Sequence, residues 1–265
     1  MNKNFRNDGY ISANGINIYY KECGAGPSLI LSHGGTDTHK FWDPFILQFS
    51  EHFRVFTPDS RGHGRTTNPS RELSYRLMAD DLAAFIQKLQ IKDPLIFGYS
   101  DGGQVALDFG MRYPDIAAAL VIGGAWYQFS KEYQDALKKA GFTGPGDVNY
   151  EIIDKNSPPG WIDRMRNAHP SPDPDYYQTL LRDISKMWWT PLNYQPDDFQ
   201  KIISPTLILM AENDEMIPVS EAREMVEMIP NAKLKVILGA SHNDIFQKGE
   251  EVLKDVIDFF LCYND

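Results

Sequence analysis

The chain has 265 residues, of which 42% are hydrophobic and 23% are charged, and these values are typical of a protein with a sizeable buried core. Its formal net charge of -10 argues against nucleic acid and anionic membranes as partners, because both repel an acidic surface. No window is apolar enough to span a bilayer, and the polar N-terminus lacks the apolar stretch of a signal peptide. We therefore expect a cytoplasmic protein whose partner is a small molecule.

The cysteines and histidines show no metal-binding spacing. Cys23 and Cys262 are the only two cysteines, and neither belongs to a CxxC motif or a Cys/His cluster. No metal site is therefore expected, and nothing in the spacing requires a disulfide. The sequence carries no signal for an oligomeric state.

The expected elements begin with an antiparallel hairpin and continue as an alternation of strands and helices. Residues 10–13 and 16–23 are extended, and Asn14-Gly15 between them is a dipeptide that two-residue hairpin turns favour. Short apolar strands are expected at 29–31, 54–57, 95–97, 119–122, 206–210 and 234–238. Amphipathic helices are expected at 74–89, after residue 100, at 220–228 with Ser220 as N-cap, and at the C-terminus. This alternation predicts a mostly parallel sheet that is covered by helices on both faces.

Residues 126–200 interrupt the alternation, so we expect a core made of 1–125 and 201–265 with a helical cap, or lid, between them. This segment is rich in proline, contains no clear buried strand, and holds four of the five tryptophans: Trp126, Trp161, Trp188 and Trp189. Aromatic side chains above the sheet edge can line a substrate pocket, although most of them are expected only to attach the cap to the core. We predict that Trp126 contributes to substrate binding.

The sharpest local motif is Gly98-Tyr99-Ser100-Asp101-Gly102-Gly103, which follows an apolar strand and opens a helix. This context is required for a nucleophile elbow, in which the serine is held in a strained conformation at the edge of the sheet. Side chains at positions 98 and 102 would collide with the neighbouring helix or strand, so glycine is needed there. We predict Ser100 to be a nucleophile.

A serine hydroxyl needs a base, and the base needs an acid that fixes its tautomer. His242 follows the last expected strand, which places it at the same sheet edge as Ser100. Asp214 follows the strand before it, with Glu212 and Glu215 as close competitors. Asp214 is preferred because its short side chain can reach inward from the turn. The predicted catalytic residues are therefore Ser100, Asp214 and His242.

A tetrahedral intermediate also needs backbone N–H donors for its oxyanion. One donor is expected from Asp101, the residue after the nucleophile. The other is expected from the turn His33-Gly34-Gly35, and we assign it to Gly35 because a glycine lets the backbone approach a substrate closely. A simple turn glycine is the alternative interpretation of Gly35.

Taken together, these motifs resemble the α/β-hydrolase superfamily. The matching elements are His33-Gly34-Gly35, the segment 59–64 (Asp-Ser-Arg-Gly-His-Gly), the segment 98–103, Asp214 with Pro218, and His242. The resemblance implies an α/β-hydrolase fold with an eight-stranded sheet, a helical cap after the sixth strand, and no cofactor. The nucleophilic aspartate of haloalkane dehalogenases and epoxide hydrolases is excluded by Ser100.

The residue after the nucleophile is informative about the substrate. Ser-Asp-Gly-Gly at 100–103 is similar to the motif of the biphenyl hydrolase-like aminoacyl-ester hydrolases, or valacyclovirases, and this resemblance implies that Asp101 binds an α-ammonium group. A carboxylate beside the scissile carbonyl can pair with a cation in a cleft that holds little water. Alternatively, Asp101 only interacts favourably with the N-terminus of its helix.

The leading functional hypothesis is a serine hydrolase that cleaves a small carboxylic ester through an acyl-enzyme, with a preference for aminoacyl esters. Other reactions are open to the same three residues, namely carbon–carbon bond hydrolysis, lactone or thioester hydrolysis, and cofactor-free haloperoxidation. A non-catalytic receptor built on this fold is the alternative of another class, since fold alone does not set function.

Overall fold

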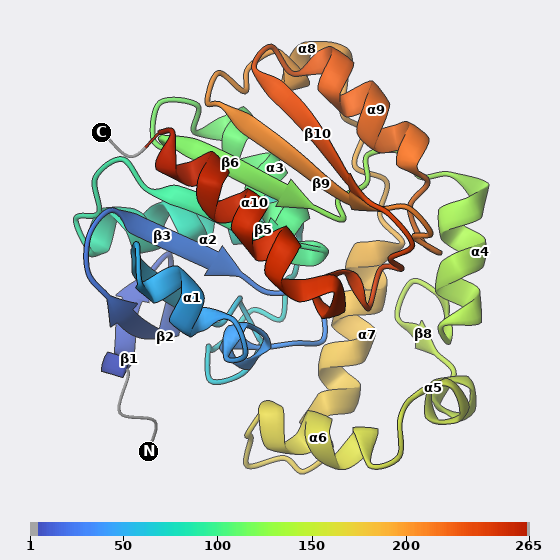
Figure 1. Cartoon of the computed structure of the whole chain (residues 1–265). Helices are drawn as coiled ribbons and strands as arrows, with labels where there is room; N and C mark the ends of the chain where they lie inside the picture. Colours follow the sequence, from blue (N-terminus) through green and yellow to red (C-terminus); the bar gives the residue numbers. More distant parts are fainter. Residues whose placement is uncertain (1–4, 264–265) are drawn as a thin grey trace.

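The computed structural model describes residues 5–263 and has a single large sheet at its centre (Figure 1). Among the described residues this sheet has the strand order β1-β2-β4-β3-β5-β6-β9-β10. Only β1, β2 and β4 pair antiparallel, and every further neighbour is parallel, as the alternation of strands and helices predicts. The strands are β1 (Phe5–Ala13), β2 (Ile16–Gly24), β3 (Ser28–Ser32), β4 (Arg54–Pro58), β5 (Leu95–Tyr99), β6 (Ala119–Gly123), β9 (Thr206–Ala211) and β10 (Ala232–Ile237).

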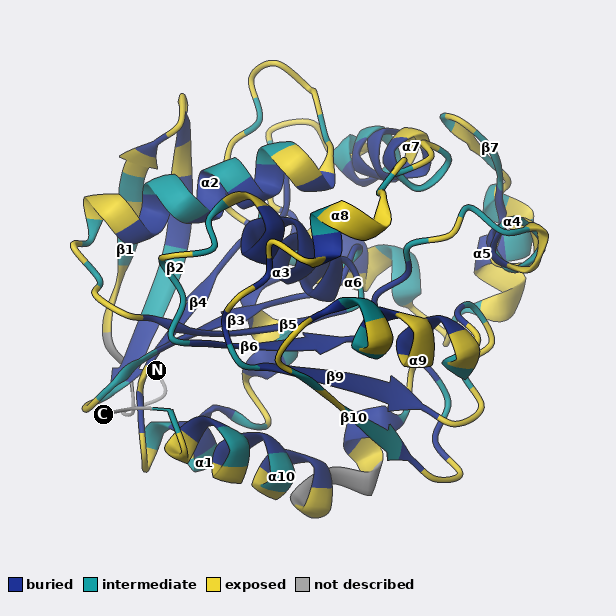
Figure 2. Cartoon of the chain, turned by 90° about the horizontal axis from the view of Figure 1, so that it is seen from above, coloured by how far each residue is buried: buried dark blue, intermediate teal, exposed yellow. Residues whose placement is uncertain are grey.

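Helices cover both faces of the sheet (Figure 2). Because side chains alternate between the two faces along each strand, the core consists of two apolar clusters, one on each face. Ile96 of β5 belongs to one apolar cluster, while Leu95 and Phe97 belong to the other. The first cluster includes side chains of α2 (Tyr75–Lys88), α3 (Asp101–Arg112) and α9 (Val219–Met228). The second includes side chains of the short helices η1 (His39–Trp42), α1 (Ile46–Ser50) and η2 (Ile245–Lys248), and of the C-terminal helix α10 (Gly249–Leu261). No helix within 5–263 is both long and apolar enough to cross a bilayer.

The segment between β6 and β9 is mainly helical and lies on the side toward which the parallel strands point (Figure 1). It also contains a short antiparallel pair, β7 (Phe142–Gly144) with β8 (Asp147–Val148), which the sequence did not predict because each strand is too short for a visible period. Its helices are α4 (Lys131–Lys139), α5 (Tyr150–Asn156), α6 (Trp161–Ala168), α7 (Tyr176–Trp188) and α8 (Pro196–Phe199). The division into a core and a cap at 126 and 200 stays a prediction.

Several local expectations differ from the structure. The helix α9 begins at Val219 with Pro218 as its N-cap, so Ser220 lies in the first turn and does not cap the helix. The short helix α1 was not expected, since its five residues are too few to show a helical period. Cys23 is buried and Cys262 is exposed, and no disulfide joins them.

A buried ion pair fixes the loop that follows β4. Arg61 Nε donates to Asp81 Oδ2 at 2.7 Å, and only 5% and 7% of the two side chains are exposed. Asn14 Nδ2 donates to Asp81 Oδ1 at 2.7 Å from the turn between β1 and β2. The motif at 59–64 is therefore tied to α2 and to the first hairpin.

Candidate active site

Ser100 is the single residue between the end of β5 and the start of α3, and its backbone is strained. Its φ of 56° and ψ of -121° are rare for a residue with a side chain. A Cβ at Gly98 would overlap the carbonyl of Gly102, and a Cβ at Gly102 would overlap the carbonyl of Ser32. The predicted need for glycine at both positions is confirmed, because α3 packs directly against the strand that precedes it and against β3.

The hydroxyl of Ser100 does not cap α3, although serine at an N-cap usually accepts a hydrogen bond from its own helix. Instead, Ser100 Oγ lies 3.0 Å from His242 Nε2. On the other side of the ring, His242 Nδ1 lies 2.6 Å from Asp214 Oδ2. With the proton assigned to Nδ1, the ring donates to Asp214 and accepts from Ser100. The structure therefore brings together the three residues predicted to be catalytic.

Asp214 is in turn held by backbone groups, and the two neighbouring glutamates bind elsewhere. Asp214 Oδ1 accepts from the N–H groups of Met216 and Ile217, both at 2.9 Å. Glu212 accepts from Gly239 N at 2.7 Å, and Glu215 accepts from the backbone N of His242 at 3.3 Å. Both glutamates thus steady the loop that carries His242, and only Asp214 reaches the imidazole ring.

The two predicted oxyanion donors both line the cavity in front of Ser100. Neither Gly35 N nor Asp101 N donates to another group within the described part of the chain. The Gly35 amide is free because it lies inside a turn in which Asp37 N donates to Gly34 O at 3.2 Å. The Asp101 amide is free because the first N–H groups of a helix have no partner within it. The two donors are thus available to a ligand.

Three histidine rings hold three consecutive carbonyls of the loop that carries Gly35. His33 Nδ1 lies 2.8 Å from Gly34 O, and His63 Nε2 lies 2.6 Å from Gly35 O. His169, which follows α6, places its Nε2 3.2 Å from the carbonyl of residue 36. Because a peptide is planar, the bond to Gly34 O also orients the N–H of Gly35.

Two of these rings act as neutral donors. Burial lowers the pKa of His33 to about 3, and burial also lowers the pKa of His169 to about 4. Each of them accepts a backbone N–H on its other nitrogen: Ser60 N lies 2.9 Å from His33, and Gly64 N lies 2.8 Å from His169. The hydrogen bonds that His33 and His169 make to the loop therefore persist across the ordinary pH range.

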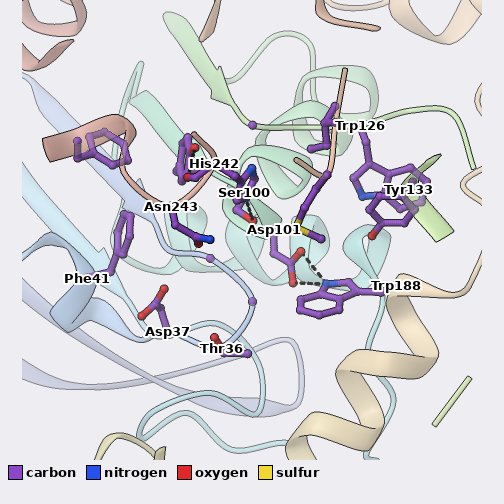
Figure 3. Close-up of a pocket in the computed structure, with 17 residues that line it drawn as sticks. Thr36, Asp37, Phe41, Ser100, Asp101, Trp126, Tyr133, Trp188, His242 and Asn243 are labelled. Carbon is purple, nitrogen blue, oxygen red and sulfur yellow. Dashed lines mark hydrogen bonds between the residues drawn. The ribbon is translucent and has the colours of Figure 1, made fainter. Parts of the chain in front are cut away.

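The cavity in front of Ser100 is small, at about 160 Å³, and aromatic side chains form several of its walls (Figure 3). Trp126, the predicted substrate-binding residue, lines it and stacks on Tyr133 with ring centroids 4.3 Å apart. Of the other tryptophans of segment 126–200, Trp188 also lines the cavity, whereas Trp161 and Trp189 are not among its lining residues. The remaining aromatic walls are Phe41, Tyr99, Tyr133 and Phe246.

Asp101 also reaches the cavity with its side chain, but its carboxylate already has partners. Tyr75 donates to Oδ1 at 2.7 Å, and Trp188 Nε1 lies 2.8 Å from Oδ1 and 2.9 Å from Oδ2 (Figure 3). Burial raises the pKa of Asp101, while these hydrogen bonds act in the opposite direction. Asp101 thus joins the nucleophile elbow to the end of α7.

Among the site residues that the sequence did not single out are Asp37, Tyr75, His169 and Trp188. Tyr75 and His169 act on residues distant in sequence, so no local motif marks them. Trp188 could not be separated from the other tryptophans of its segment without knowing how α7 packs. Asp37 follows the predicted His33-Gly34-Gly35 turn by two residues, and this proximity is the one signal that could have found it. Within residues 5–263 there is no group of three metal-ligating side chains.

Comparison with known proteins agrees with this architecture. A family model described as alpha/beta hydrolase fold matches residues 27–249. A bifunctional esterase/perhydrolase of Acinetobacter calcoaceticus is 26% identical, over 95% of this chain and 99% of its own length. A 2-hydroxy-6-oxo-6-(2'-aminophenyl)hexa-2,4-dienoic acid hydrolase of Metapseudomonas resinovorans is 25% identical, over 94% and 89%. The crystal structure of an E-2-(acetamidomethylene)succinate hydrolase superimposes with a TM-score of 0.77 at 18% identity, covering 97% of this chain and 99% of the other.

The packing around Gly35 predicts a contrast between two adjacent glycines. A Cβ at Gly35 would overlap Asp101 Oδ2 and lie 2.7 Å from the ring of Trp188, so Gly35→Ala should lower the free energy of unfolding by about 1–3 kcal/mol. A Cβ at Gly34 would meet nothing closer than 3.4 Å, so Gly34→Ala should cost less than about 1 kcal/mol. Urea unfolding followed by tryptophan fluorescence measures both; equal losses would contradict this packing.

Proposed function

The chain belongs to the alpha/beta hydrolase fold family and is a hydrolase of ester or related bonds, and from this premise we propose that it cleaves a small carboxylic ester with Ser100 as nucleophile. His242 is the general base and Asp214 orients it. The backbone N–H groups of Gly35 and Asp101 are the oxyanion donors. The observation that carries the proposal is the unbroken chain of hydrogen bonds from Asp214 through His242 to Ser100, at 2.6 and 3.0 Å.

The chemistry follows from this geometry. Ser100 Oγ attacks the acyl carbon while His242 Nε2 takes its proton, and the imidazolium that forms is stabilised by Asp214. The carbonyl oxygen becomes an oxyanion that the Gly35 and Asp101 amides stabilise, helped by the N-terminus of α3. His242 then returns the proton to the leaving oxygen, which releases the alcohol and leaves Ser100 acylated. Water, activated by His242, completes the cycle by hydrolysing the acyl-enzyme.

The walls of the cavity favour neutral or cationic substrates over acidic ones. Among the described residues that line it there is no lysine or arginine, whereas two carboxylates, Asp37 and Asp101, reach it. A substrate carboxylate would therefore find no ion-pair partner and would be repelled. This feature supports an ester substrate different from the dienoic acid named for one relative and from the succinate derivative named for one structural neighbour.

The finer proposal is a preference for aminoacyl esters, with Asp101 as the acceptor of the α-ammonium group. Asp101 is buried beside Ser100, and its Oδ2 accepts only from Trp188, so this oxygen retains a free lone pair. An ammonium group bound there would share the oxygen with the indole N–H. The support is thus the position and charge of Asp101, together with the motif at 100–103.

Ser100→Ala tests the nucleophile. The variant should lower kcat/KM on an activated acetyl ester by at least about a thousandfold, because the acyl-enzyme cannot form. Ser60→Ala is a matched control, since this nearby serine is not among the residues that line the cavity. Steady-state kinetics with both variants gives the comparison, and turnover by Ser100→Ala at the wild-type rate would refute the assignment.

Asp101→Asn tests the aminoacyl preference. An α-amino ester should be cleaved about tenfold faster, in kcat/KM, than its des-amino analogue, and the substitution should remove that advantage because the amide carries no charge. Asn keeps an oxygen acceptor for Tyr75 and Trp188, so the fold should persist. If wild type shows no advantage for the amino ester, or if Asp101→Asn retains it, the finer proposal fails.

A further inference from the structure

Asp37 is a second carboxylate in the cavity, and it has no partner. Within the described residues its side chain makes no hydrogen bond and no ion pair, which contrasts with the bonded carboxylate of Asp101. The side chain is open to solvent in the cavity, yet the surrounding walls are close enough that burial raises its pKa to about 6. No hydrogen bond or ion pair within the described residues therefore accounts for an aspartate at position 37.

The position of Asp37 is set by the same turn that presents the Gly35 amide. Asp37 N donates to Gly34 O, and the carbonyls of Gly34 and Gly35 are held by two buried histidines. A Cβ built on Gly34 would lie 3.4 Å from Ser100 Cβ and 3.6 Å from Asp37 Oδ2, so these two atoms are no farther apart than the sum of those distances. The turn thus holds the backbone of Asp37 so that its carboxylate lies within reach of a group attached to an ester bound at Ser100.

Asp37 lies on the leaving-group side of Ser100. Figure 3 shows Asp37, Phe41 and Asn243 on the side of His242, and Asp101 and Trp188 on the opposite side. The ring contacts agree, because Phe41 stacks on Tyr99 at 6.3 Å and Tyr99 packs on His242 at 5.4 Å. His242 must deliver its proton to the leaving oxygen, so the alcohol part of the ester occupies this side of the cavity.

The walls of this half are suited to a cation. Phe41 and Phe246 line it with their rings, and aromatic faces attract positive charge. Asn243 offers an amide, and no lysine or arginine is among the described lining residues to neutralise Asp37. A cationic group would meet the carboxylate of Asp37 and aromatic rings, while a neutral alcohol would leave the carboxylate without a partner.

We propose that Asp37 binds a positively charged group on the alcohol part of the substrate, so that this hydrolase prefers esters of cationic alcohols. The inference rests on the proposed ester hydrolysis at Ser100, and it assigns to Asp37 a site distinct from that of Asp101. The chemical class it selects is an ester whose alcohol carries a quaternary or primary ammonium group a few bonds from the ester oxygen.

The test compares two acetyl esters that have the same shape and differ in charge. The cationic ester is acetylcholine, and its neutral isostere is 3,3-dimethylbutyl acetate. In wild type the ratio of their kcat/KM values should favour the cationic ester about tenfold, and in Asp37→Asn the ratio should fall to near one. The ratio should persist in Asp101→Asn, which acts on the acyl side, and in Asp115→Asn, which removes an exposed charge on the loop between α3 and β6.

A binding measurement separates this inference from the proposed reaction. Choline should bind wild type more tightly than 3,3-dimethylbutanol does, and Asp37→Asn should abolish that difference, as followed by ligand-observed NMR with thermal unfolding as a check of folding. If choline is preferred through Asp37 but neither ester is cleaved, the proposed function fails and the Asp37 site stands. A wild-type ratio near one, a ratio unchanged in Asp37→Asn, or an equal loss in Asp101→Asn would each overturn the inference.

Discussion

The turn between β5 and α3 leaves room for one residue, and the rest of the site depends on that constraint. Packing of α3 against β3 and β5 forces positions 98 and 102 to be glycine and forces Ser100 into a rare backbone conformation. The strain is offset by the buried strands on either side, which place the hydroxyl at the carboxyl edge of the sheet. The loops after β9 and β10 lie at the same edge of the sheet. His242 can therefore contact the Ser100 hydroxyl directly, and Asp214 can contact the ring of His242.

A second constraint operates on the opposite wall, where the Gly34–Gly35 loop faces the elbow. Its carbonyls are held by His33, His63 and His169, and the last of these joins the loop to the segment between β6 and β9. Asp101 and Trp188 form another bridge to that segment. The loop and the elbow are therefore fixed relative to each other before a substrate arrives, which is the condition for donors to stabilise an oxyanion without reorganising.

The parts of this architecture that were predictable from sequence are those with a local physical signature. The nucleophile elbow is marked by glycines on both sides of Ser100, the strands are marked by short apolar runs, and His242 is marked by its position just after the last strand. The preference for Asp214 over Glu212 and Glu215 agrees with their contacts. What escaped prediction depends on packing between distant segments: that Trp188 faces the cavity beside Trp126, that His169 reaches the Gly35 loop, and toward which side Asp37 points. The start of α9 escaped for a local reason, since Pro218 and Ser220 are both plausible near an N-terminus.

The proposed reaction requires that one serine, Ser100, is made reactive by its place in the fold. Labelling with a fluorophosphonate probe, followed by mass spectrometry of the digested protein, tests it directly. We expect one phosphonylated residue, Ser100, and we expect labelling to be strongly slowed in His242→Gln. Modification at another serine with Ser100 unmodified would refute Ser100 as the nucleophile, and absence of labelling in folded protein would favour a binding protein built on a hydrolase fold.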